Sequence, residues 1–70
     1  MKPEVLQAAK TGAEQIAKET EGRSDALGYA EELANDVNSD LNLGYERGSD
    51  CYGCLFKACY DAIWEATKGM

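Results

Sequence analysis

Three cysteines, Cys51, Cys54 and Cys59, lie within nine residues of the C-terminal third of the chain. The Cys51–Cys54 pair has the CxxC spacing of thiol redox centres and of half a zinc site. A structural zinc site needs four ligands, however, and the chain has no histidine to complete the set. An odd number of cysteines also argues against a disulfide framework. The pattern favours structural thiols with no bound metal or cofactor; if a metal does bind, Cys51 and Cys54 are its candidate ligands.

The same stretch carries an aromatic side chain at every fourth position, which places these residues on one ridge of a helix. The ridge consists of Tyr52, Phe56, Tyr60 and Trp64. Two interpretations stay open. The aromatics form part of the core, where aromatics at helical spacing are usually found. Alternatively, part of the ridge is exposed and mediates self-association, since tyrosine and tryptophan are enriched at protein interfaces.

Negative charge is concentrated in the middle of the chain. The whole chain has a formal net charge of −6, and residues 25–50 hold seven acids against Arg47 alone. If this region is helical, one narrow stripe of the helix contains Asp25, Glu32, Asp36 and Asp40. The stripe predicts contact with a partner protein that has a basic surface, and it argues against direct binding to nucleic acid. The other residues expected at this contact are Tyr29, Tyr45 and Glu46.

These residues must be positioned by helices, because apolar residues recur at helical spacing along most of the chain. We expect helices over about residues 3–21, 25–41 and 51–68, and a loop over residues 42–50 that contains two glycines. Pro3 suits a first helical turn, Ser24 or Asp25 is expected to cap the second helix, and Ser49 or Asp50 the third. The inward stripe expected on the second helix is Ala26, Leu27, Ala30, Leu33, Ala34, Val37 and Leu41.

The sequence thus predicts one all-α domain over residues 1–70. It is either a three-helix bundle or a pair of helical hairpins assembled as a homodimer through the third helix. A chain of 70 residues builds a small core, so help from a second chain is a reasonable expectation. No apolar run is long enough for a membrane span and no signal peptide is evident, so we expect a cytoplasmic protein that does not enter membranes.

No nucleophile–base pair and no phosphate-binding loop is evident, so we expect no enzymatic activity. The prediction is a small acidic interaction module. Its most concrete form is an inhibitor of the phage type, such as an anti-CRISPR or anti-restriction protein, that occupies a basic nucleic-acid-binding surface. This rests on an analogy of size and charge. The alternatives are a thiol or zinc protein that uses Cys51 and Cys54, and a structural assembly subunit.

Overall fold

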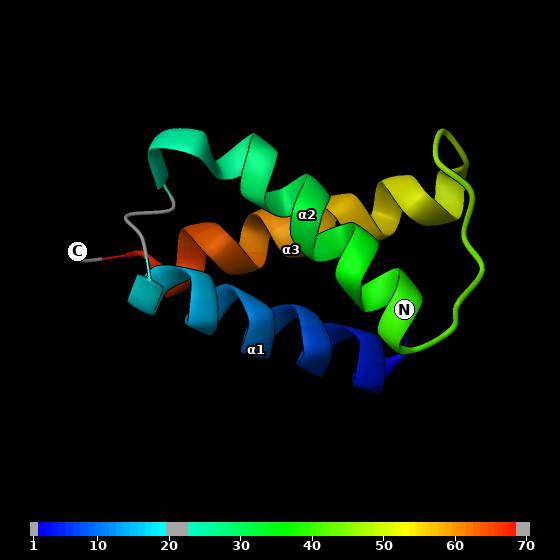
Figure 1. Cartoon of the computed structure of the whole chain (residues 1–70), viewed down its shortest axis with the longest axis horizontal. Helices are drawn as coiled ribbons and strands as arrows, with labels where there is room; N and C mark the ends of the chain where they lie inside the picture. The colour runs from blue at the N-terminus through cyan, green and yellow to red at the C-terminus, as the bar shows by residue number, and fades with distance from the viewer. Residues whose placement is uncertain (1, 20–22, 69–70) are drawn as a thin grey trace.

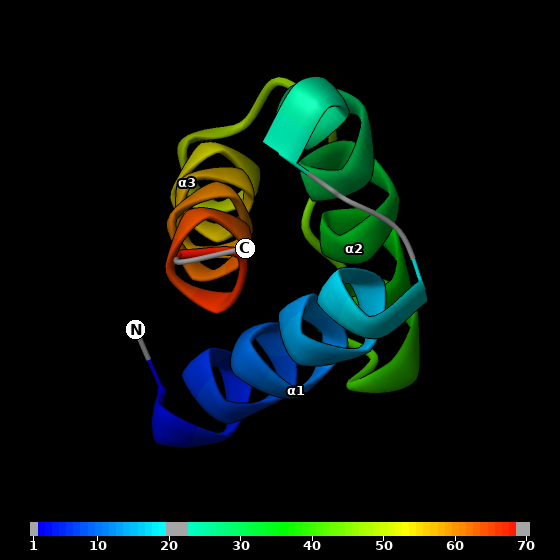
Figure 2. The same cartoon turned by 90° about the vertical axis from the view of Figure 1, so that its left-hand side faces the viewer.

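The computed structural model describes residues 2–19 and 23–68 of the chain. Within these ranges it contains the α-helices α1 (Pro3–Glu19), α2 (Ala26–Asp40) and α3 (Asp50–Ala66), with a short 3-10 turn, η1 (Arg23–Asp25), before α2. Helices α1 and α3 run in the same direction and α2 runs in the opposite one (Figure 1). Seen along the long axis, the three helices occupy the corners of a triangle (Figure 2). The predicted all-α class is confirmed, and the arrangement is that of a helical bundle.

The predicted start of α1 and one of the two predicted caps of α3 agree with the structure, whereas no predicted side-chain cap forms at α2. Pro3 opens α1, and the end expected for this helix, at about residue 21, lies outside the described residues. The hydroxyl of Ser49 caps α3 by accepting a hydrogen bond from the Tyr52 N–H at 3.2 Å. At α2, Asp25 occupies the cap position but makes no side-chain capping hydrogen bond. The turn η1 leads into α2 instead, so α2 begins one residue later than expected.

The end of α2 is fixed by a Schellman-type turn. The N–H of Asn42 donates to the Ser39 carbonyl at 3.1 Å, and the N–H of Leu43 donates to the Asn38 carbonyl at 2.9 Å. Asn42 adopts the positive φ of 53° that this turn requires. The amide of Asn38 then bonds both backbone groups of Tyr45, at 2.8 and 3.0 Å. The loop between α2 and α3 is therefore tied to the last turn of α2.

The core combines small side chains from α1 and α2 with larger ones from α3. Helix α3 packs against both other helices, and its Leu55, Cys59 and Ile63 are fully buried. The small side chains opposite are Ala9, Ala13, Ala26, Ala30 and Ala34. Gly12 leaves room for Leu33 of α2, because a Cβ at position 12 would clash with Cδ1 of Leu33. These small residues let the helices approach closely around a thin core.

Two residues expected on the inward stripe of α2 are exposed. Leu27 is 63% exposed and Leu41 is 36% exposed, whereas Ala30, Leu33 and Val37 between them are buried. Leu27 lies at the far edge of the inward arc, about 100° round the helix from the buried Ala26, and Leu41 lies just beyond the last residue of α2. None of the described helices is long and apolar enough to cross a membrane.

Candidate functional site

The carboxylates predicted for partner contact form a narrow stripe on α2. Glu32, Asp36 and Asp40 are exposed on the helix, and Asp25 is exposed at its start. At about 100° and 1.5 Å per residue, the four side chains fall within an arc of roughly 80° and span about 22 Å. We call Asp25, Glu32, Asp36 and Asp40 the α2 acidic stripe. The buried face of α2 anchors its backbone to the core, so the helix positions that carry Glu32, Asp36 and Asp40 are fixed relative to one another.

The α2 acidic stripe is not neutralised by ion pairs within the described part of the chain. There, Arg47 pairs with Glu31, and Lys57 pairs with Asp61 at 3.8 Å. Neither pair uses a carboxylate of the stripe. Lys10, Lys18 and Lys57 line hollows between α1 and α3, a region to which α2 contributes no residue. The negative potential on α2 is therefore not cancelled by these lysines.

Gly28 makes room for one member of the stripe. A Cβ at Gly28 would lie 2.7 Å from Oδ2 and 2.9 Å from Oδ1 of Asp25. The carboxylate of Asp25 thus folds over the first turn of α2 without capping it. A larger residue at position 28 would push this carboxylate away.

The other residues predicted at the partner contact are Tyr29, Tyr45 and Glu46, and they do not all lie on the same side of α2. Tyr29 is partly buried against the core, about 40° round the helix from Asp25, so it lies within the arc of the stripe. Tyr45 is held through its backbone by Asn38, which lies roughly 160° round α2 from the centre of the stripe. Glu46 is exposed on the same loop. Tyr29 thus lies beside the carboxylates of the stripe. The loop that carries Tyr45 and Glu46 is bound to another side of α2.

Most of the aromatic ridge of α3 packs into the bundle. Tyr52 is only 7% exposed, and its hydroxyl donates a hydrogen bond to Oδ1 of Asn35 at 2.7 Å. Phe56 and Tyr60 are partly buried against the core. Trp64 is 37% exposed and meets the ring of Tyr60 edge-on, with the ring centroids 6.0 Å apart. The interpretation of the ridge as part of the core therefore applies to Tyr52, Phe56 and Tyr60, whereas Trp64 is exposed at the surface.

The cysteines divide by burial. Cys51 and Cys54 are exposed in the first turns of α3, and Cys59 is buried. Desolvation by burial raises the pKa of the Cys59 thiol to about 11, which keeps it protonated at neutral pH. Across the described residues, no group of three or more histidine, cysteine, aspartate or glutamate side chains is placed to hold a metal ion. The CxxC pair thus has no further protein ligand beside it in this part of the molecule.

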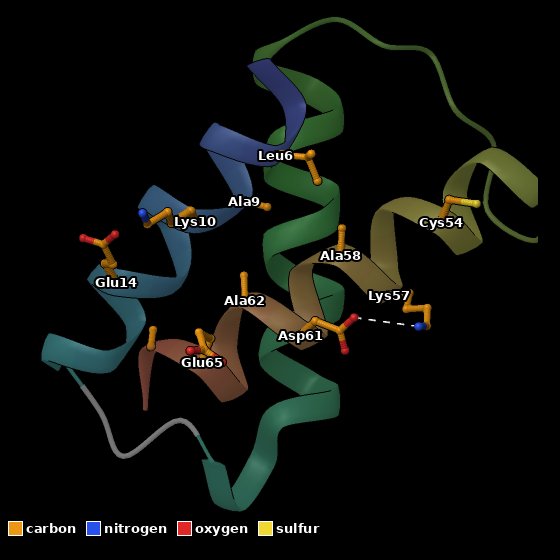
Figure 3. Close-up of a pocket in the computed structure, with 11 residues that line it drawn as sticks. Leu6, Ala9, Lys10, Glu14, Cys54, Lys57, Ala58, Asp61, Ala62 and Glu65 are labelled. Carbon is orange, nitrogen blue, oxygen red and sulfur yellow. Dashed lines mark ion pairs between the residues drawn. The ribbon is translucent and has the colours of Figure 1, made fainter. Parts of the chain in front are cut away.

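A groove lies between α1 and α3 and was not predicted from the sequence. The groove has a volume of about 830 Å³, and its residues are shown in Figure 3. Its walls are formed by small or apolar residues, which are Leu6, Ala9, Cys54, Ala58, Ala62 and Ala66. A signal for it existed in the sequence, because Cys54, Ala58, Ala62 and Ala66 recur every four residues along one side of α3.

The molecule thus presents two distinct surfaces, the α2 acidic stripe and the groove between α1 and α3. The first is charged and convex, and the second is apolar and concave. Both are suited to contact with other molecules, by different physical means. Compared with known proteins, the chain matches no protein family, no curated protein and no solved structure.

Proposed function

We propose that this chain is a protein-interaction module whose α2 acidic stripe binds a basic surface of another protein. The observation that carries the proposal is the placement of four exposed carboxylates on one side of a packed helix, none of them in an ion pair among the described residues. A concentration of one charge sign attracts a surface of opposite sign and accelerates association with it.

The rigidity of α2 favours recognition of a specific partner. Ala30, Leu33, Ala34 and Val37 are buried against the other helices, so the charged side of α2 does not need to order on binding. A preorganised surface loses less conformational entropy when it binds. Tyr29 lies within the arc of the stripe and adds an aromatic group of the kind that often anchors protein contacts.

In its most concrete form, the partner's basic surface is one that otherwise binds nucleic acid. Carboxylates spaced along a rigid helix of about 22 Å offer such a surface a row of negative charges in place of phosphates. The chain would then act as an inhibitor that competes with nucleic acid and does not bind it, because like charges repel. Anti-CRISPR and anti-restriction proteins of phages are the type of inhibitor that this proposal describes.

A displacement experiment tests the proposal. Fluorescent duplex DNA is bound to RNA-guided nucleases and restriction endonucleases, and the anisotropy of the DNA is followed as the chain is added. We expect the chain to displace DNA from at least one of these enzymes at a one-to-one ratio, and less effectively as salt is raised. If the chain displaces DNA from none of these enzymes, the inhibitor proposal is contradicted.

A matched pair of variants locates the contact in the same experiment. Glu32→Gln with Asp36→Asn removes two charges from the stripe, and Gln7→Lys with Thr11→Lys changes the net charge equally on the exposed side of α1. We expect displacement to weaken with the first variant and to persist with the second. Equal weakening by both would show that net charge alone is responsible. Stoichiometric zinc in protein purified under reducing conditions would instead support the thiol or zinc alternative.

A further inference from the structure

The two cysteines at the start of α3 do not fill space in the core. Cys51 and Cys54 are both exposed, whereas Cys59 is fully buried among apolar side chains. A free cysteine that contributes to packing is usually buried, where it behaves as a small apolar residue. A packing role therefore describes Cys59, and it leaves the presence of two exposed thiols on one turn of α3 to be explained by their chemistry.

The spacing of Cys51 and Cys54 is close to that of a disulfide. Residues three apart in a helix have Cα atoms about 5 Å from each other, inside the range of about 4.4–6.8 Å that disulfides span. Their Cβ atoms are about 5–6 Å apart in a regular helix, whereas a disulfide needs about 3.8 Å. A bond between the two sulfurs therefore requires a small movement of the first turn of α3.

The first turn of α3 is free to make this movement. The first N–H groups of a helix have no acceptor within the helix, and here Ser49 supplies two acceptors. Its hydroxyl accepts from the Tyr52 N–H at 3.2 Å, and its carbonyl accepts from the Gly53 N–H at 3.0 Å. Beyond the adjoining turns of α3, no atom of the described chain lies within 4 Å of where a Cβ at Gly53 would stand. The backbone between the cysteines can thus shift without collision.

We propose that Cys51 and Cys54 form a reversible thiol–disulfide pair that exchanges with low-molecular-weight disulfides. The thiolate of one cysteine attacks a sulfur of the small disulfide, which forms a mixed disulfide and releases one small thiolate. The thiolate of the other cysteine then attacks the modified cysteine sulfur, which closes the Cys51–Cys54 bond and releases the second small thiolate. The cysteine pair loses two electrons, the small disulfide gains them, and the two thiol protons pass to the solvent.

Closure of the bond is opposed by the cap of α3. Movement of Cys51 towards Cys54 turns the backbone that carries the Tyr52 N–H away from the hydroxyl of Ser49. The dithiol form therefore has the capping hydrogen bond and the disulfide form lacks it, so the cap favours the dithiol form and the disulfide is easily reduced. The proposal is independent of the proposed function, because no residue of the α2 acidic stripe takes part.

Equilibration of the whole chain with reduced and oxidised glutathione tests the proposal, with acid quenching, alkylation and mass spectrometry as the readout. We expect a form that lacks two thiol hydrogens, has its new bond between Cys51 and Cys54, keeps the thiol of Cys59 and is restored by dithiothreitol. Cys51→Ser and Cys54→Ser each remove one partner of the bond. Each variant should therefore accumulate the mixed disulfide with glutathione on its remaining exposed cysteine.

A substitution at the cap tests the link between oxidation and the start of α3. Ser49→Ala removes the hydroxyl that favours the dithiol form. The ratio of disulfide to dithiol should then rise about fivefold at the same glutathione concentrations, the factor expected for a typical N-cap. Ser39→Ala is the matched control, because it makes the same change at an exposed position of α2, and it should leave the ratio unchanged. Circular dichroism checks that each protein is folded.

Three results would overturn the proposal. The first is a chain that keeps both exposed thiols, or carries glutathione on them, without closing the bond between them. The second is a disulfide that includes Cys59 or joins two chains. The third is an equal ratio of disulfide to dithiol in Ser49→Ala and Ser39→Ala, which would show that the cap does not oppose closure.

Discussion

Replacement of Leu55 by alanine is expected to lower the free energy of unfolding by about 2–5 kcal/mol. Leu55 is fully buried on α3, in a core cluster that includes five alanines, and an alanine side chain cannot expand into the space that Leu55 would leave. A domain of this length has a total stability of roughly 4–10 kcal/mol. The substitution therefore removes a large share of the stability, and part of the population is expected to be unfolded at 37 °C.

Urea unfolding followed by circular dichroism measures this effect. Leu27→Ala is the control, since it deletes the same atoms from a side chain that is 63% exposed. Its effect should be within about 0.5 kcal/mol of zero, as is usual for surface substitutions. Similar losses for Leu55→Ala and Leu27→Ala would contradict the packing described for α3.

Reversal of two charges in the α2 acidic stripe is expected to abolish partner binding. Glu32→Lys with Asp36→Lys places cations where the proposed partner is also positive, so attraction is replaced by repulsion. We expect an affinity loss of at least about 100-fold at low salt, because closely approaching charge pairs at interfaces have coupling energies of about 1.5 kcal/mol or more each. Both side chains are exposed, so the helix content should not change. DNA displacement from a sensitive nuclease measures the loss.

The control for this reversal is again Gln7→Lys with Thr11→Lys. It adds half as much positive charge as the reversal, on the exposed side of α1. If net charge alone governed binding, the decrease in the logarithm of the binding affinity would be about half as large for the control as for the reversal. A contact through the stripe predicts almost no loss for the control, and so the two explanations give different results.

The sequence predicts the helices well because burial of apolar residues at helical spacing dominates their formation. Val5, Ala9 and Ala13 on α1 are buried as their spacing indicates. The Ser49 cap was also predictable, since it depends on residues within one turn of each other. At α2, the competing 3-10 turn leaves Asp25 without a capping bond, and local spacing did not reveal this.

Features that depend on contacts beyond a single helical turn could not be predicted. The loop position of Tyr45 is set by Asn38, seven residues earlier, and Arg47 reaches Glu31, sixteen residues earlier. The exposure of Leu27, beside the buried Ala26 and at the edge of the inward arc, is set by how the helices pack together and not by the spacing of the apolar residues alone. The groove depends on the relative tilt of α1 and α3 (Figure 2), which the apolar periodicity of each helix does not specify.

The central claim is that α2 is the side of this molecule that docks on a basic partner. NMR cross-saturation from an unlabelled nuclease that loses its DNA to the chain tests this claim most directly, because it reports which amides lie at the contact. The account predicts that saturation is strongest at amides of α2 between Asp25 and Asp40. Strongest saturation along α3, or along the groove at Ala9 and Ala62, would contradict it.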